Sequence, residues 1–257
     1  MEKNIVIKLY LVLMLLALIS IPLFSNAKGE DKTELLKKAK YEESVGNYWA
    51  AIKLYNKLLE LEPNSADLYF RRGISKIELK DAKGAVEDFT KSIELRPSFV
   101  DTYKERAQAY YDLNDFPHAL ADNDKAIELD PADADLFYNR GIVKLKVEDT
   151  TNAYIDFNKA IKLYSNHAAA LLERGHLKNK QGNNEAALED LNKSIEYEPE
   201  NPLAYKYRAM VYISTQQKDK ACEDLLKAKE MGYTNQIQKL LLDNGCYELS
   251  HNTIKPE

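Results

Sequence analysis

Two rows of opposite charge recur through the sequence with a constant period of 34. They are Arg72, Arg106, Arg140, Arg174 and Arg208, and Asp88, Asp122, Asp156, Asp190 and Asp224. The preceding segment has Lys38 and Leu54 at the matching positions, so both members change together, which favours pairing of each Arg with the Asp that follows it within the same segment. A planar guanidinium group can bind a carboxylate through two N–H donors. We predict structural ion pairs rather than an anion-binding arginine ladder, because a ligand-specific site should break the period.

Two cysteines, Cys222 and Cys246, are the next candidates for chemistry. In an exported protein two cysteines commonly pair. A bridge between them would fasten a terminal helix over residues 234–246 to the rest of the chain. Two buried thiols that never meet are the alternative. A metal site has little support, since no Cys-x-x-Cys motif or histidine cluster accompanies the cysteines.

Catalytic groups are sparse. The four histidines are scattered, with no metal-ligand spacing and no nucleophile beside them: His118, His167, His176 and His251. The sequence has no glycine-rich phosphate loop. Acidic pairs such as Glu42 and Glu43 are typical of solvated helix faces. The sequence therefore predicts a protein that is not an enzyme and that holds no cofactor and no metal.

Two rows of small residues repeat with the same period of 34. One row is Ala51, Ala85, Ala119, Ala153, Ala187 and Ala221, and the other is Ala39, Gly73, Ala107, Gly141, Gly175 and Ala209. Antiparallel helices approach closely only where neither carries a bulky side chain. The rows therefore predict pairs of helices that cross at these positions.

Bulky apolar rows and prolines complete each unit. We expect a core seam from Leu61, Leu95, Leu129, Leu163, Tyr197 and Met231, and from Tyr55, Phe89, Phe157, Leu191 and Leu225, with Asn123 as the one polar exception in the second row. Proline disfavours a helical residue before it. Pro63, Pro97, Pro131 and Pro199 should therefore end the second helix of four units.

A 34-residue helix-turn-helix unit with small crossing residues and a terminal proline resembles the tetratricopeptide repeat (TPR). The resemblance implies an all-α, right-handed superhelical α-solenoid. Six repeats are expected at residues 32–65, 66–99, 100–133, 134–167, 168–201 and 202–235, followed by a capping helix at 234–246 and a flexible tail at 247–257.

The N-terminus has the pattern of a secretory signal peptide. Lys3 and Lys8 precede an uncharged apolar run at residues 9–24, and Ser25, Asn26 and Ala27 form a small-x-small cleavage site. We predict cleavage between Ala27 and Lys28, with a short leader at 28–31. The alternative is an uncleaved anchor, which would be the chain's one association with a membrane.

Charge limits the classes of partner. The formal net charge of the 257 residues is −5. Nucleic acids and anionic membrane surfaces require a basic face. Partners are therefore expected to be other proteins, with no nucleic acid.

In the TPR family, the first helices of successive repeats line a concave groove that holds a peptide or a partner's helix. Matching of helical phase transfers this role to Leu36, Phe70, Ile74, Ile77, Lys104, Gln108, Tyr111, Tyr138, Ile142, Leu145, His176, Lys206 and Met210. For any one of these residues, packing against a neighbouring first helix is the alternative. An apolar floor with aromatic side chains and mixed charge suits an extended or helical segment.

The resemblance also bears on the kind of partner and the location. Family members that bind acidic tails of cytosolic chaperones use a set of basic residues and asparagines. Here Ala169 and Glu173 stand where two of the basic residues are needed. The residue usage is similar to that of bacterial envelope TPR proteins of the Bacteroidetes type. We expect a non-catalytic scaffold of the periplasm or cell envelope, or alternatively an accessory specificity subunit of an enzyme or transport complex.

Overall fold

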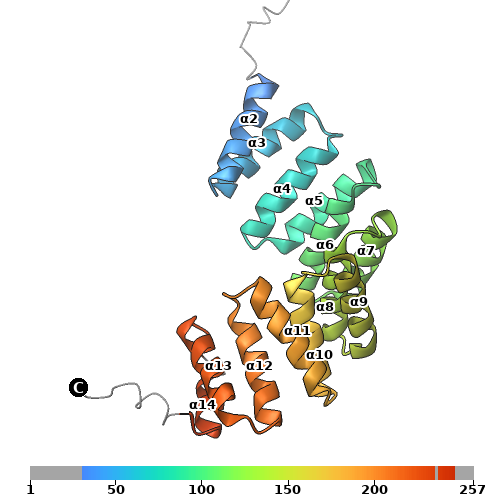
Figure 1. Ribbon diagram of the computed structural model, residues 1–257. Helices are drawn as coiled ribbons and strands as arrows, with labels where there is room; N and C mark the ends of the chain where they lie inside the picture. The colour runs from blue at the N-terminus through green and yellow to red at the C-terminus, as the bar shows by residue number, and fades with distance from the viewer. Residues whose placement is uncertain (1–30, 235–236, 247–257) are drawn as a thin grey trace, which may run out of the picture. The chain divides into compact units, whose positions relative to one another are not determined.

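The structure is a computed structural model that describes residues 31–234 and 237–246. These residues form thirteen α-helices and no β-strand (Figure 1). The predicted fold class, an all-α solenoid of paired helices, is confirmed. The helices are α2 (Lys32–Ser44), α3 (Tyr48–Leu61), α4 (Ala66–Glu78), α5 (Ala82–Leu95), α6 (Val100–Asp112), α7 (Phe116–Leu129), α8 (Ala134–Lys146), α9 (Thr150–Leu163), α10 (Ala168–Lys180), α11 (Asn184–Tyr197), α12 (Pro202–Ser214), α13 (Lys218–Glu230) and α14 (Ile237–Asp243).

The chain divides into two units, Met1–Pro63 and Asn64–Glu257. The first unit holds the pair α2 and α3, which pack on each other. In the second unit each helix from α4 to α14 packs on the next one along the chain. The first helices α4 and α6 also touch, as do α10 and α12, so first helices of neighbouring repeats lie side by side.

The small residues lie at the helix crossings. A Cβ atom added to Gly73 would come within 2.6 Å of the Phe89 ring, and one added to Gly141 would meet the Phe157 ring at the same distance. Both phenylalanines are fully buried. Glycine is needed here because the aromatic ring of the second helix packs directly on the backbone of the first.

The prediction of a core seam at the ends of the second helices was wrong for half of its members. Leu61 is 59% exposed, and Leu163 and Tyr197 are also exposed. Each is the last residue of its helix, as are the half-buried Leu95 and Leu129, so the row lies at the edge of each helix pair rather than inside it. The second apolar row is buried as expected, and Asn123 is buried with it.

The Arg and Asp rows form the ion pairs that their spacing indicated. Arg106 donates from Nε and Nη2 to the two carboxylate oxygens of Asp122, at 2.8 and 2.7 Å. In four repeats the remaining Nη1 group donates to the preceding repeat, as from Arg106 to Thr90 Oγ1 at 2.9 Å and from Arg140 to Asp124 at 2.7 Å. Each of these arginines therefore joins two repeats.

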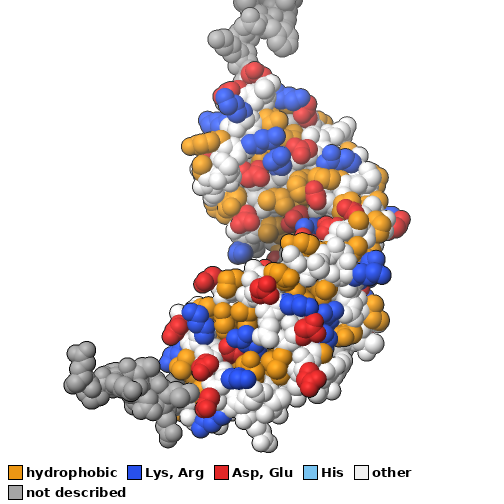
Figure 2. Space-filling model, viewed as in Figure 1, with side chains coloured by type: hydrophobic (Ala, Val, Ile, Leu, Met, Phe, Trp, Pro, Cys, Tyr) orange, Lys and Arg blue, Asp and Glu red, His pale blue; other side chains and the backbone are white. Residues whose placement is uncertain are grey.

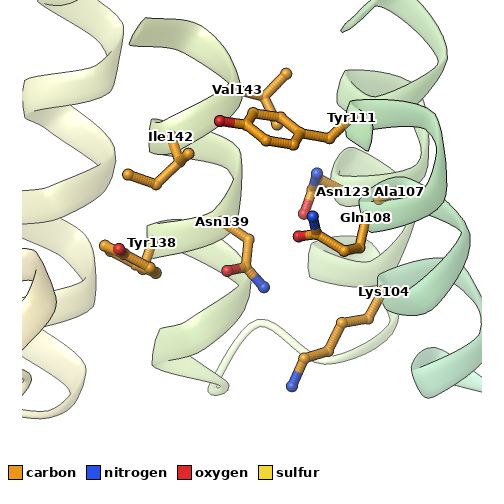
Figure 3. Close-up of a pocket in the computed structure, with 9 residues that line it drawn as sticks. All are labelled: Lys104, Ala107, Gln108, Tyr111, Asn123, Tyr138, Asn139, Ile142 and Val143. Atoms are coloured by element: carbon orange, nitrogen blue, oxygen red, sulfur yellow. The ribbon is translucent and has the colours of Figure 1, made fainter. Parts of the chain in front are cut away.

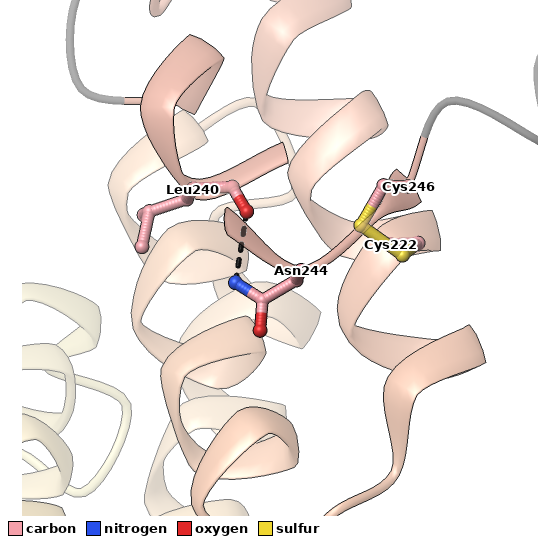
Figure 4. The surroundings of a disulfide bond; sticks show 4 residues. All are labelled: Cys222, Leu240, Asn244 and Cys246. Carbon is pink, nitrogen blue, oxygen red and sulfur yellow. Dashed lines mark hydrogen bonds between the residues drawn. A yellow bond between two sulfur atoms is a disulfide. The ribbon is translucent and has the colours of Figure 1, made fainter. Parts of the chain in front are cut away.

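The C-terminal helix covers the last repeat (Figure 4). α14 is shorter than the predicted helix at 234–246, and residues 235–236 lie outside the described part. Ile237 and Leu241 are buried in one cluster with Leu225. Cys222 and Cys246 form a disulfide, so this cap is covalently fastened to α13.

The turn inside each repeat contains one residue in the left-handed region. The six residues are spaced by 34: Gly46, Lys80, Asn114, Glu148, Gly182 and Gln216, with φ between 58° and 79°. Glycine adopts this conformation without steric cost, whereas lysine, glutamate and glutamine do not. Three of the turns therefore carry strain that the two glycine turns lack.

We expect Glu148→Gly to raise the free energy of unfolding by about 0.5 to 1 kcal/mol, because it removes that strain. Urea denaturation followed by circular dichroism measures the change. Val147→Gly is the matched control. Val147 has φ of −98°, which valine adopts without strain, so glycine at this position should lower the stability of the protein. An equal loss of stability in both variants would contradict the strain at Glu148.

None of the helices in the described residues combines the length and the apolar character needed to cross a bilayer. The predicted signal peptide, its cleavage site at Ala27 and Lys28, and the tail at 247–257 lie outside the described residues.

Candidate functional site

A cavity of about 170 Å³ lies between α6 and α8 (Figure 3). Lys104, Gln108 and Tyr111 line it from one face of α6, at the three- and four-residue spacing that places side chains in a row. From α8, Tyr138 and Ile142 also line it, with side chains that point away from α6 in Figure 3. The remaining lining residues are Ala107, Asn123, Asn139 and Val143.

A second cavity, of about 590 Å³, continues from the first toward α10. The two share Lys104, Tyr138 and Asn139, so they are adjoining parts of one groove. The second cavity adds Asp135, Tyr164, Asn166, His167, Ala168, Ala169, Tyr197 and Glu198. His167 caps α10, since its Nδ1 atom accepts a hydrogen bond from the backbone N–H of Ala170. Its Nε2 atom lies 3.2 Å from Asp135.

A third cavity, of about 600 Å³, lies near the C-terminal cap. The ring of His176 stacks on that of Tyr207, with centroids 3.9 Å apart and planes inclined by 9°. The cavity is lined by His176, Lys180, Lys206, Tyr207, Met210, Lys239, Leu240 and Asp243. Three lysines line this cavity, whereas Lys104 is the one lysine of the described residues that lines the first two cavities.

Burial raises the pKa of three side chains on the first helices. It raises the pKa of Tyr138 to about 12, with Glu173 and Glu198 adding to the effect, and it raises the pKa of Tyr207 as well. The pKa of Glu173 is also raised by burial. The two tyrosine hydroxyls therefore stay protonated to a higher pH than an exposed tyrosine does.

The lowered pKa of His176 should make the stability of the protein depend on pH. Burial, with Lys180 and Lys206 nearby, lowers its pKa from 6.5 to about 4. The unfolded chain then binds a proton more readily than the folded chain as the pH falls from 6.5 to 4, so stability decreases over this range. We expect a loss of about 1 to 2 kcal/mol from this residue.

Urea midpoints at pH 7 and pH 4 measure this effect against the His176→Gln variant. The variant should lose less stability than the parent chain between the two values. Equal losses would show that His176 is protonated as easily in the folded as in the unfolded chain.

The structure divides the thirteen predicted groove residues into four groups. Five line the adjoining cavities between α6 and α10, and three line the C-terminal cavity: Lys104, Gln108, Tyr111, Tyr138 and Ile142, then His176, Lys206 and Met210. Four pack partly buried against core clusters: Phe70, Ile74, Ile77 and Leu145. Leu36 is half-buried on α2 in the first unit.

Phe70 shows why matching of helical phase overestimates the groove. Its ring lies 5.9 Å from that of Phe89 and 5.0 Å from that of Phe99. Phe70 therefore belongs to the packing between helices, and its replacement would test stability as much as binding.

Several lining residues were not among the predicted groove residues. Asn123, on the second helix α7, lines the first cavity, and Tyr207 lines the third. The interruption of an apolar row at Asn123 was the available signal. Tyr207 follows the predicted Lys206 directly, and only the helix geometry shows that both reach the same cavity.

The visible surface carries mixed charge. On the face drawn in Figure 2, acidic and basic side chains are intermixed, with apolar side chains between them. His118 is exposed beside Asp115, at 2.7 Å, and His251 lies outside the described residues.

Comparison with known families agrees with the repeat pattern. The description "TPR repeat" matches residues 107–147, and "Tetratricopeptide repeat" matches residues 36–98 and 172–232. None of the curated proteins compared with the chain matches it in sequence.

Solved structures share the fold at low sequence identity. PilF of Pseudomonas aeruginosa is 19% identical with a TM-score of 0.73, over 83% of this chain and 98% of PilF. A tetratricopeptide repeat protein of Parabacteroides merdae is 20% identical with a TM-score of 0.63, over 84% and 99%. YrrB, described as a TPR protein with an unusual peptide-binding site, is 22% identical with a TM-score of 0.57, over 71% and 94%.

Paired helices that recur with one constant period, with a groove across their first helices, define a helical repeat protein of the kind that serves in protein–protein interaction. The matched ranges together cover more than half of the sequence. The chain belongs to the tetratricopeptide repeat family.

Proposed function

We propose that this protein is a non-catalytic scaffold of the periplasm or cell envelope that binds a peptide or a helix of a partner protein. The binding surface is the groove formed by the two adjoining cavities between α6, α8 and α10. The observation that carries the proposal is that the half-buried ring of Tyr138 lines both cavities together with Lys104 and Asn139.

The side chains suit a peptide in two respects. Tyr111, Tyr138 and Ile142 offer apolar surface at low entropic cost, as aromatic anchors of interfaces do. Gln108 and Asn139 offer both donors and acceptors, which match the backbone groups of an extended chain. YrrB, with its peptide-binding site, is a relative in fold that supports this reading.

The export part of the proposal rests on the N-terminal pattern around Lys3, Lys8 and Ala27, and on the disulfide of Cys222 and Cys246. Disulfides persist in oxidising compartments. N-terminal sequencing of the protein from its native host should find Lys28 as the first residue. An intact Met1 would contradict cleavage.

A peptide-display selection on the purified protein tests the groove. Selected peptides should bind at least about tenfold more weakly to Lys104→Glu, because the substitution reverses a charge that both cavities share. Lys162→Glu is the matched control, since Lys162 is exposed on α9 and lines neither cavity. An equal loss of affinity for both variants, or an unchanged affinity for both, would contradict the groove as the binding site.

A further inference from the structure

Asn123 occupies a position that an aromatic ring fills in the repeats on either side. Phe89 and Phe157 stand one period before and one period after it, and both are fully buried against a crossing glycine. In the third repeat the crossing residue is Ala107 and the side chain opposite it is the much smaller Asn123. The space of a ring is therefore not filled from α7.

That exchange coincides with the cavity of about 170 Å³ in Figure 3. An engineered cavity of about 150 Å³ lined by apolar side chains is large enough to bind benzene. The cavity between α6 and α8 is thus of the size of one aromatic ring. Ala107, Tyr111, Ile142 and Val143 contribute apolar walls.

The amide of Asn123 leaves an acceptor without a partner at this cavity. Asn123 is 2% exposed, and its Nδ2 atom donates to the backbone carbonyl of Ala119 at 2.8 Å. Its Oδ1 atom is buried and finds no hydrogen-bond partner in the described part of the chain. Turning the amide over would place Oδ1 against the Ala119 carbonyl, so the orientation is fixed. Buried polar atoms in native proteins are rarely left unpaired, so this acceptor is available to a donor that enters the cavity.

The positive charge of Lys104 limits which hydrogen-bond donors can occupy the cavity. Lys104 lines the cavity and disfavours a second cation such as a lysine or arginine side chain. The occupant that fits is a flat apolar ring with a neutral donor at its far end. A phenol ring meets both conditions, and its hydroxyl needs such a partner when it is buried.

We propose that this cavity is an anchor pocket for a tyrosine side chain of the partner, whose hydroxyl donates a hydrogen bond to Asn123 Oδ1. This inference rests on the proposed function, because the tyrosine belongs to the peptide in the groove. It names the side chain, tyrosine, that the groove recognises at one position of that peptide.

The probes are p-cresol, which is the tyrosine side chain alone, and toluene, which lacks the hydroxyl. Each is titrated into the full chain and followed by amide chemical shifts. We expect p-cresol to shift amides of α6, α7 and α8 and to bind about tenfold more tightly than toluene, the ratio that one buried hydrogen bond supplies. No binding of p-cresol at these helices, or equal binding of toluene, would overturn the proposal.

Asn123→Leu removes the acceptor at similar side-chain size. The sixth repeat already pairs an alanine with a leucine at these positions, Ala209 with Leu225, so the variant should fold. It should lose the preference for p-cresol over toluene. Asn139→Leu, at another asparagine of the same cavity, should retain it. A preference that survives in Asn123→Leu would overturn the role of Oδ1 and leave water as the partner of that atom.

Selected peptides separate this inference from the proposed function. A peptide that depends on Lys104 but tolerates replacement of every tyrosine by alanine contradicts the anchor pocket and leaves the groove standing. If no peptide binds at all, the groove itself is wrong, whatever p-cresol does.

Discussion

Arg106→Ala should destabilise the protein by about 3 to 4 kcal/mol, whereas Arg140→Ala should cost only about 1 to 2 kcal/mol. Both arginines hold a buried aspartate through two hydrogen bonds. The difference lies in a second cation. Lys144 lies 2.7 Å from Asp156 and remains after Arg140 is removed. The matching residue of the third repeat is Tyr110, so Asp122 keeps no paired cation among the described residues.

The Tyr110→Lys substitution provides a control for this prediction. In the Arg106→Ala background it supplies the cation that Lys144 provides to Asp156, and it should recover part of the lost stability. Unfolding is best followed by far-ultraviolet circular dichroism, because the one tryptophan, Trp49, is 74% exposed and reports weakly on folding. Equal losses for Arg106→Ala and Arg140→Ala would contradict the account of the second cation.

Replacement of both Cys222 and Cys246 by alanine should lower stability by about 3 kcal/mol. The two cysteines are separated by 24 residues in sequence, and a cross-link over such a loop restricts the unfolded chain by about this amount. In a repeat array each unit depends mainly on its neighbours. The loss should therefore concentrate at α13 and α14, where the amides should exchange faster with solvent, and leave α4 to α9 protected.

Reduction of the parent chain with a thiol should reproduce the effect, and the double alanine variant should not respond to the thiol. Uniform loss of protection from α4 to α14 would show instead that the cap controls the whole array. An unchanged unfolding midpoint would contradict a structural role of the disulfide.

Most of the fold could be predicted because every unit repeats the same requirement for small residues where its two helices cross. The joint change of Arg and Asp to Lys38 and Leu54 indicated their pairing. The bond of each arginine to the preceding repeat could not be found in this way, because its acceptors differ: Thr90, Asp124, Asn158 and Asn192. The period also failed at Leu61 and Leu163, since apolar character alone does not show that a residue ends its helix.

The candidate site was less predictable. Helical phase identified Lys104, Gln108 and Tyr138, but it could not separate cavity residues from Phe70, which packs on Phe89 and Phe99. Asn123 was visible as an exception to a row. Its unpaired oxygen and the cavity beside it required the positions of α6, α7 and α8.

We propose that a partner protein occupies the groove along α6 and α8. A photoreactive amino acid placed at Gln108 in the native host tests it most directly, with Glu128 on the adjacent helix α7 as the comparison. Both side chains are exposed, but only Gln108 lines the cavity. Illumination should give a crosslinked protein partner from Gln108 and none from Glu128. The same adducts from both positions, or an adduct from Glu128 alone, would contradict the groove as the binding site.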